Sequence, residues 1–312
     1  MVAIKGDWQL LKLAFNMQRH YSTEQICWLC HASKGNVDPA MCYAKLNGAW
    51  RHTILASLPW LPEETPALSF LRGFNLLMVA PDLLHCWHRG HGADMIASVI
   101  AAMLEAHEFG RFHQLETANA DLSRFLKRHR MRCTINLSNA TLGISSTTFP
   151  ELHGKGADAT AIHKWLVALV ADNRVRDPLH ARLIQHSDIF LTTVMGCGWQ
   201  MSPQQAIVAQ QSGMAYLTAY IAAADHARQQ KKRLFWLRPK FHAFTHAVLS
   251  CHRPSRRSVH MDACWMDEDF VGKLMDVMAT ASNYSTSSQK VCERWLLGLP
   301  DRMAHSASQS HS

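Results

Sequence analysis

Two cysteines three positions apart are the first residues whose spacing indicates metal chemistry. Cys27 and Cys30 form a Cys-x-x-Cys pair, and two thiolates at this spacing can hold a zinc ion, which takes four ligands in a tetrahedron. His31 and Cys42 are close enough along the chain to complete the set, although they form no clean second pair. Two buried, reduced cysteines would explain the pattern equally well, whereas a thioredoxin-like role is less favoured because no βαβ pattern surrounds the pair. The sequence therefore predicts either a structural zinc site or a metal-free pair.

An aspartate followed by a histidine one helical turn later is the second candidate. Asp82 follows Pro81 at the start of an expected helix, and His85 comes three residues on. The two side chains could act in metal binding or proton transfer. An aspartate at this position is also an effective helix cap, and the residues alone favour the cap.

A basic cluster near residue 240 is the third candidate. Arg238, Lys240 and His242 surround a proline and a phenylalanine, with His246 one helical turn further on. Such a cluster can contact the phosphates of a nucleic acid, and solvated charges at a helix start would look the same. A histidine-rich metalloenzyme built on this pair with His85 and His88 is less favoured, because 20 histidines produce such spacings by chance.

Three consecutive acids, Asp267, Glu268 and Asp269, precede an apolar helical pattern. Their charges suit the positive end of a helix macrodipole. They could also hold Mg²⁺ if a further carboxylate lay opposite them.

Composition limits the class of protein. The chain has 312 residues, 48% of them hydrophobic, and a formal net charge of +8, which favours polyanionic partners such as DNA only weakly. Its nine cysteines and the lack of a leader-like N-terminus predict reduced thiols in a soluble intracellular protein. We expect no membrane segment, and self-association is left open.

The elements expected to position these residues are mostly helical. Residues 2–5 read as a short strand that delivers Asp7, and a loop-rich segment containing the cysteines follows the next helix. Helical periodicity or helix-end signals predict helices over 8–17, 94–107, 120–130, 158–170, 180–194, 203–227, 242–251, 267–281 and 289–297.

The order of these segments resembles the DDE transposases of the ribonuclease-H-like group, in particular the Plavaka- and KDZ-like proteins encoded by transposons. The matching residues are Lys5-Gly6-Asp7-Trp8, Arg19-His20-Tyr21, Cys27 with Cys30, Pro81-Asp82-Leu83-Leu84-His85 with Gly90, Arg238-Pro239-Lys240-Phe241-His242 with His246, and Asp267-Glu268-Asp269-Phe270-Val271-Gly272. The similarity spans most of the chain.

The resemblance implies DNA strand cleavage and transfer with Mg²⁺ ions held by three carboxylates. Asp7, Asp82 and Glu268 would be those catalytic residues, and Arg238, Lys240 and His242 would contact nucleic acid. Alternatively, Asp7 is the second acid and the first lies upstream of Met1. This truncated interpretation is slightly favoured, so we expect no strand transfer by the chain alone.

The expected fold is mainly α with a small α/β part. Residues 1–92 would form a partial ribonuclease-H-like core with the cysteine segment, 93–234 a helical insertion, 235–300 the C-terminal helical part of the core, and 301–312 a disordered tail. The resemblance implies a nuclear protein. The alternative function is a non-catalytic helical interaction protein with at most a structural zinc.

Overall fold

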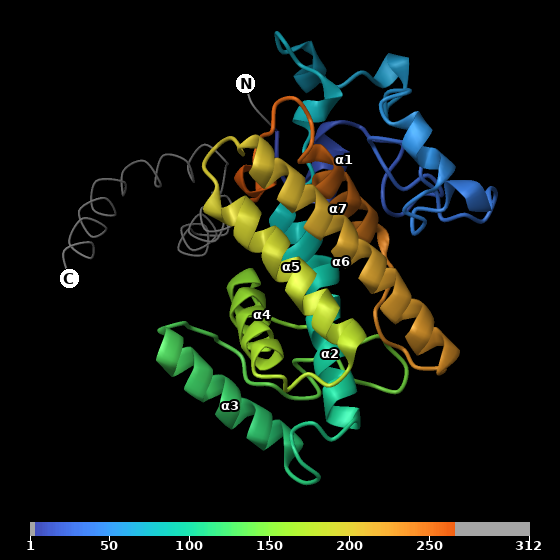
Figure 1. The fold of residues 1–312 in the computed structure, drawn as a ribbon. Coiled ribbons are helices and arrows are strands. Elements are labelled where there is room, and N and C mark those ends of the chain that lie inside the picture. Colours follow the sequence, from blue (N-terminus) through green and yellow to red (C-terminus); the bar gives the residue numbers. More distant parts are fainter. Residues whose placement is uncertain (1–3, 266–312) are drawn as a thin grey trace, which may run out of the picture. The chain divides into compact units, whose positions relative to one another are not determined.

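Helices form the framework of the part of the chain that the computed structural model describes, residues 4–265 (Figure 1). The α-helices are α1 (Trp8–Ala14), α2 (Gly92–Glu105), α3 (Gln114–His129), α4 (Gly156–Ala171), α5 (Pro178–Gly196), α6 (Pro203–Gln229) and α7 (Pro239–Ser250). Short 3₁₀ helices are η1 (Pro39–Met41), η2 (Ala49–Thr53), η3 (Pro62–Glu64), η4 (Ala67–Phe70), η5 (Leu76–Met78) and η7 (Val259–Asp262), and η6 (Leu84–His91) is a π-helix.

The chain divides into two units, residues 1–263 and residues 264–312. The predicted boundaries near residues 92 and 234 fall inside the first unit, and the division into three parts stays a prediction. The helices predicted over 267–281 and 289–297 and the tail 301–312 lie outside the described residues.

Local sequence signals start the longest helices. Asp177 caps α5 by accepting hydrogen bonds from the amides of Leu179 and His180, and Pro178 occupies the first turn, where its missing N–H leaves no bond unmade. Ser202 and Gln205 form a reciprocal capping box at the start of α6. These two helices are joined by a short connection and pack against each other as a hairpin.

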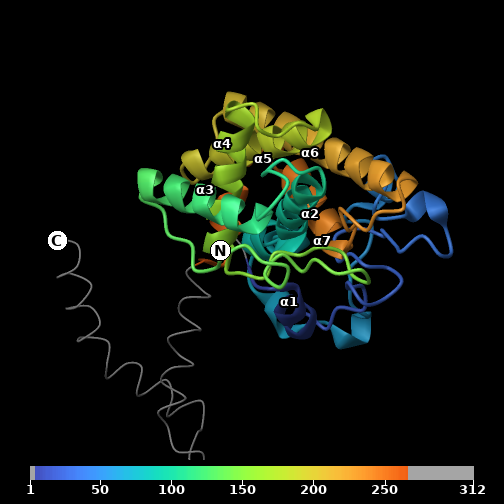
Figure 2. The same cartoon turned by 90° about the horizontal axis from the view of Figure 1, so that it is seen from below.

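Helix α2 lies at the centre of the helical packing (Figure 2). Every residue from Gly92 to Ile100 is buried, and helices α4, α5, α6 and α7 surround this segment in the view from below. A helix that is buried on all sides carries apolar or small residues all round, as in the run Met95-Ile96-Ala97-Ser98-Val99-Ile100. This central position explains why α2 lacks the polar face of a surface helix.

Irregular structure with short 3₁₀ helices occupies residues 16–80. It contains no α-helix, and its buried side chains include Trp28, Trp50 and Trp60 together with aliphatic residues such as Ile26 and Val79. Such a segment gains little from regular backbone hydrogen bonding, so it needs other constraints to stay in place.

The predicted ribonuclease-H-like core is wrong, because that fold needs a central sheet and the described residues contain only isolated β-bridges. Of the predicted first strand, the structure describes residues 4 and 5, and Ile4 pairs with Val79 in one parallel bridge. On the side of Val79, a 3₁₀ helix (Leu76–Met78) and Pro81 limit further pairing. The mainly helical character was predicted correctly.

Among the described residues, no helix is both long and apolar enough to span a membrane.

Candidate metal centre

The segment around Cys27 and Cys30 folds back on itself as a tight loop. An antiparallel bridge joins Gln25 to Ser33, and the amide of Ile26 donates to the carbonyl of Ala32. Inside this loop the amide of Leu29 donates to Sγ of Cys27 at 3.3 Å, and the amide of Ala32 donates to Sγ of Cys30 at 3.4 Å. Backbone N–H groups aimed at sulfur stabilise thiolates, which are the form that binds metal.

Helix α7 supplies two histidines to the same place. His242 and His246 are four residues apart, so both rings project from one face of the helix. Phe241 precedes His242 and Phe244 lies between the two histidines, and both phenylalanines are fully buried, which fixes the helix against its neighbours. The helical spacing therefore delivers a ligand pair of the kind that the cysteine loop lacks.

The four side chains meet in one cluster. Sγ of Cys30 lies 3.3 Å from Nε2 of His242 and 3.4 Å from Nε2 of His246, and the two Nε2 atoms are 3.1 Å apart. Together with Sγ of Cys27, these ligand atoms all lie within 4.8 Å of one another, and all four residues are buried. Two thiolates and two imidazoles are a common tetrahedral zinc set, so the group could bind a metal such as zinc.

Neighbouring groups orient the histidine rings. Nδ1 of His242 lies 3.3 Å from the carbonyl oxygen of Tyr43, so Nδ1 is the protonated nitrogen and Nε2 keeps its lone pair for a metal. The Trp50 ring packs edge-on to His242 with ring centroids 4.5 Å apart and also contacts His246 at 5.5 Å. Arg19 fixes the cysteine loop by donating to the carbonyls of Cys27 and Trp28.

The electrostatics of the two cysteines differ. Burial would raise the pKa of Cys27, but the hydrogen bond with Cys30 and the nearby His246 and His242 lower it well below the ordinary value. The pKa of Cys30 is raised, first by burial and then by the neighbouring Cys27. A cluster that already favours one thiolate is suited to a cation, whose charge would draw off the second proton.

The other two predicted ligands lie outside this group. Nε2 of His31 pairs with the hydroxyl of Ser57 at 2.8 Å, and the Cys42 side chain packs beside Gly35. The sequence identified the Cys27 and Cys30 half of the site and singled out His242 and His246 for other roles. Their i, i+4 spacing on an expected helix was the signal that could have completed the set.

Asp7 and Asp82 line the same cavity, whose volume is about 300 Å³. Each begins a helical segment: Asp7 accepts from the amide of Leu10, and Asp82 accepts from the amide of Leu84 while its other oxygen contacts Nδ1 of His85. The capping role predicted for Asp82 is therefore present, and Asp7 caps α1. Glu268, the third predicted catalytic acid, lies outside the described residues.

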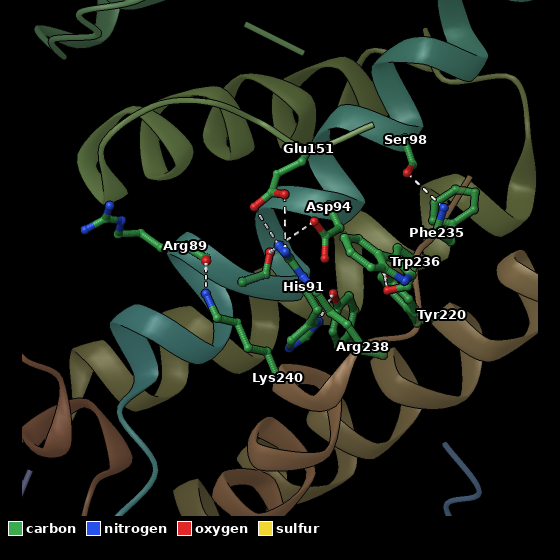
Figure 3. Close-up of polar contacts among 12 residues, drawn as sticks. Arg89, His91, Asp94, Ser98, Glu151, Tyr220, Phe235, Trp236, Arg238 and Lys240 are labelled. Carbon is green, nitrogen blue, oxygen red and sulfur yellow. Dashed lines mark hydrogen bonds and ion pairs between the residues drawn. The ribbon is translucent and has the colours of Figure 1, made fainter. Parts of the chain in front are cut away.

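The predicted phosphate-binding residues are engaged inside the fold (Figure 3). Arg238 pairs with Asp94 at 2.6 Å and with both oxygens of Glu151, and Nζ of Lys240 donates to the carbonyl of Arg89 at 2.7 Å. His242 is fully buried among the four candidate metal ligands, so its side chain has no exposed surface with which to contact nucleic acid.

A break inside η6 explains these contacts. The backbone leaves helical geometry at Arg89 and Gly90, which frees the carbonyls that Lys240 and Arg238 contact. A Cβ at Gly90 would lie 2.6 Å from the carbonyl oxygen of His85, so the break needs glycine there. Sequence reasoning missed Asp94 and Glu151, because nothing local distinguishes an acid that meets an arginine more than 80 residues away.

Searches among protein-family models, curated proteins and solved structures give no match to this chain.

Proposed function

We propose that the chain is a zinc-binding protein in which Cys27, Cys30, His242 and His246 hold one structural zinc ion. The observation that carries the proposal is the convergence of two thiols and two imidazole nitrogens, all buried, within 4.8 Å. The cysteines and the histidines come from parts of the chain more than 200 residues apart, so the metal would link the irregular segment 16–80 to helix α7.

A structural role is favoured over a catalytic one. Four protein ligands complete a tetrahedron, whereas a catalytic zinc keeps one position open for water or substrate. The four ligand residues are buried and the Trp50 ring packs against both histidines, as in a closed structural site. Zinc binding supplies about 10–16 kcal/mol in zinc-finger peptides, enough to offset the backbone entropy of ordering about ten residues, such as the loop around the two cysteines.

The test is the zinc content of purified chains by mass spectrometry, together with the visible spectrum after substitution with Co²⁺. We expect one zinc per chain in the wild type and a Co²⁺ spectrum of tetrahedral geometry with sulfur ligands. Cys30→Ser and His246→Gln should each lose most of the metal, because either change removes one of four ligands.

His31→Gln and Cys42→Ser are the matched controls, since both residues are close to the cysteine pair in sequence but lie outside the cluster. Both should keep full zinc content. Metal that survives in Cys30→Ser but is lost in Cys42→Ser would contradict the proposed ligand set.

A second candidate function is divalent-cation binding for phosphodiester chemistry at Asp7 and Asp82. One observation favours it. Ile4 and Val79 pair in a parallel bridge, each acid comes three residues after one of them, and both acids line one cavity. Two carboxylates on one side of a cavity are a starting point for Mg²⁺, which would polarise a phosphate and activate water.

Binding of Mn²⁺ in place of Mg²⁺, followed by electron paramagnetic resonance, tests this function without requiring cleavage by the chain alone. Asp7→Asn and Asp82→Asn should weaken Mn²⁺ binding, and Asp38→Asn, an exposed cap of η1, should not. Equal Mn²⁺ binding by all four proteins would remove the candidate.

A further inference from the structure

The cavity beside Asp7 and Asp82 has walls that neither proposed metal site explains. Its volume is about 300 Å³, and most of its surface is apolar. Trp8, Tyr21 and Trp28 supply three aromatic rings, and Leu11 and Pro239 add apolar surface. This size is at the lower end of the range for small-molecule sites, which also combine mostly apolar walls with a few polar groups.

The aromatic rings are arranged with their faces at steep angles. Trp8 meets Tyr21 at 74° with ring centroids 5.6 Å apart, and it meets Trp28 at 77° with centroids 5.0 Å apart. Neither pair is stacked face to face, so the wall keeps aromatic surface for a flat ligand. Trp28 is rigidly held, because its indole N–H donates to the carbonyl of Val79 and its backbone lies between Cys27 and Cys30.

Polar groups with defined hydrogen-bonding roles face the same space. The His85 ring, which is paired with Asp82, lines the cavity together with Asp7. A flat ring with hydrogen-bonding groups around its edge would match these side chains, whereas a purely apolar ring would make no hydrogen bond to them.

A second, polar hollow of about 500 Å³ adjoins the first and shares Asp7, His85 and Lys240 with it. The exposed Arg89 lines this hollow, and the Lys240 ammonium bonds to a neutral carbonyl there. Glu151 also lines it, but Arg238 pairs with that carboxylate. Besides the Glu151–Arg238 pair, the charged side chains that line this hollow are Arg89, Lys240 and Asp7, a balance of one positive charge. An aromatic cavity beside such a hollow suits a flat ring attached to an anion.

We propose that the aromatic cavity binds the base of a nucleotide and that the attached phosphate lies in the polar hollow beside Lys240 and Arg89. Base stacking on aromatic side chains and phosphate contact with Lys and Arg are the two general modes of single-strand recognition. The inference goes beyond the structural zinc and needs no chemistry at the two acids. It rests on the zinc proposal only because the cysteine loop positions Trp28.

Calorimetric titration of the zinc-loaded full chain, without added Mg²⁺ or Mn²⁺, tests the proposal. The probes are AMP and CMP, ribose 5-phosphate as a phosphate that lacks a base, and a short single-stranded oligonucleotide. We expect the base-containing probes to bind at least about tenfold more tightly than ribose 5-phosphate, as base stacking on aromatic side chains predicts. Binding of the mononucleotides indicates a free nucleotide as ligand, and binding of the oligonucleotide alone indicates a strand; both support base binding.

Trp8→Leu should weaken binding of the base-containing probes about 10- to 100-fold, and Trp8→Phe should restore part of it. Trp199→Leu is the matched control, because Trp199 is about half exposed and does not line the cavity. Zinc content is measured for every variant, so loss of base binding at full zinc content is separated from failure of the metal centre. Equal affinity for ribose 5-phosphate, no effect of Trp8→Leu and Tyr21→Leu, or no binding of any probe would overturn the proposal.

Discussion

At the residue scale, burial decides how the ionisable side chains behave. Asp94 is fully buried at the start of α2, and burial raises its pKa to about 8 although Arg238 opposes the rise. Two further histidines, His88 and His163, are buried without lying in the metal cluster, and burial lowers their pKa values to about 3 and about 4. A buried group resists taking up charge because the protein interior solvates ions less well than water does.

The burial of His163 leads to a prediction about the stability of the protein in acid. Its Nε2 lies 2.8 Å from the Ser187 hydroxyl, which itself donates to the Ile184 carbonyl, so the neutral ring donates to Ser187. The pKa of His163 is lower in the folded chain than in the unfolded chain, so in this range the unfolded chain binds a proton that the folded chain does not bind. The free energy of unfolding therefore falls as pH drops from about 6.5 toward 4.

We expect the wild type to lose about 2 kcal/mol more stability than His163→Gln between pH 7 and pH 5. Glutamine can still donate to Ser187 but does not titrate. Urea unfolding of both proteins at the two pH values measures the difference, and the exposed His52→Gln serves as the control that should follow the wild type. Parallel losses in wild type and His163→Gln would show that this ring is not the titrating group.

At the scale of elements, one glycine lets the helices α5, α6 and α7 approach one another closely. A Cβ at Gly213 of α6 would lie 2.7 Å from both methyl groups of Val248 in α7 and 3.0 Å from the Phe190 ring in α5. Val248 and Phe190 are fully buried, so neither can move aside into solvent. The close approach of these helices therefore depends on the absence of a side chain at this position.

Gly213→Ala should destabilise the protein by about 1–3 kcal/mol, because overpacking outweighs the helix propensity that alanine adds. Gly196→Ala is the matched control, since nothing lies within 4 Å of a Cβ at the end of α5, and its effect should stay within about 0.5 kcal/mol. Thermal unfolding of both variants measures the contrast. A neutral Gly213→Ala would mean that α6 can shift without loss.

At the scale of the whole described unit, two kinds of order are combined. The helices α2, α4, α5, α6 and α7 bury a continuous apolar core, whereas residues 16–80 have no α-helix and meet α7 at the cysteine and histidine cluster. The proposed zinc would therefore stabilise mainly the irregular segment, because the helical core has its own packing.

Removal of zinc with a chelator should increase hydrogen exchange in residues 16–80 while most of the far-ultraviolet helical signal remains. The melting temperature should fall as well, because zinc binds the folded state preferentially. Cys30→Ser, already deficient in zinc, should show little further change on chelation and is the control. Unchanged exchange in the wild type after verified zinc loss would contradict the structural role.

Sequence patterns anticipated the helices to different degrees. Pro203, which suits the first turn of a helix, correctly placed the start of α6. The helix predicted over 180–194 overlaps α5, which begins two residues earlier at Pro178, after the cap Asp177. For α3 the pattern predicted a start at 120, six residues later than the observed start at Gln114, whose flanking His113 has a left-handed backbone that no cap signal marked. The described part of the strand predicted at residues 2–5 forms one bridge, between Ile4 and Val79.

The sequence by itself determined the mainly helical character and the cysteine half of the metal cluster, since both follow from spacing over a few residues. Only the tertiary structure decided that His242 and His246 complete the cluster, that Arg238 is committed to Asp94 and Glu151, and that the predicted sheet is absent from the described residues. These features depend on contacts between segments tens to hundreds of residues apart. Local periodicity cannot specify them, because such contacts arise only when the helices pack and exclude water from the groups between them.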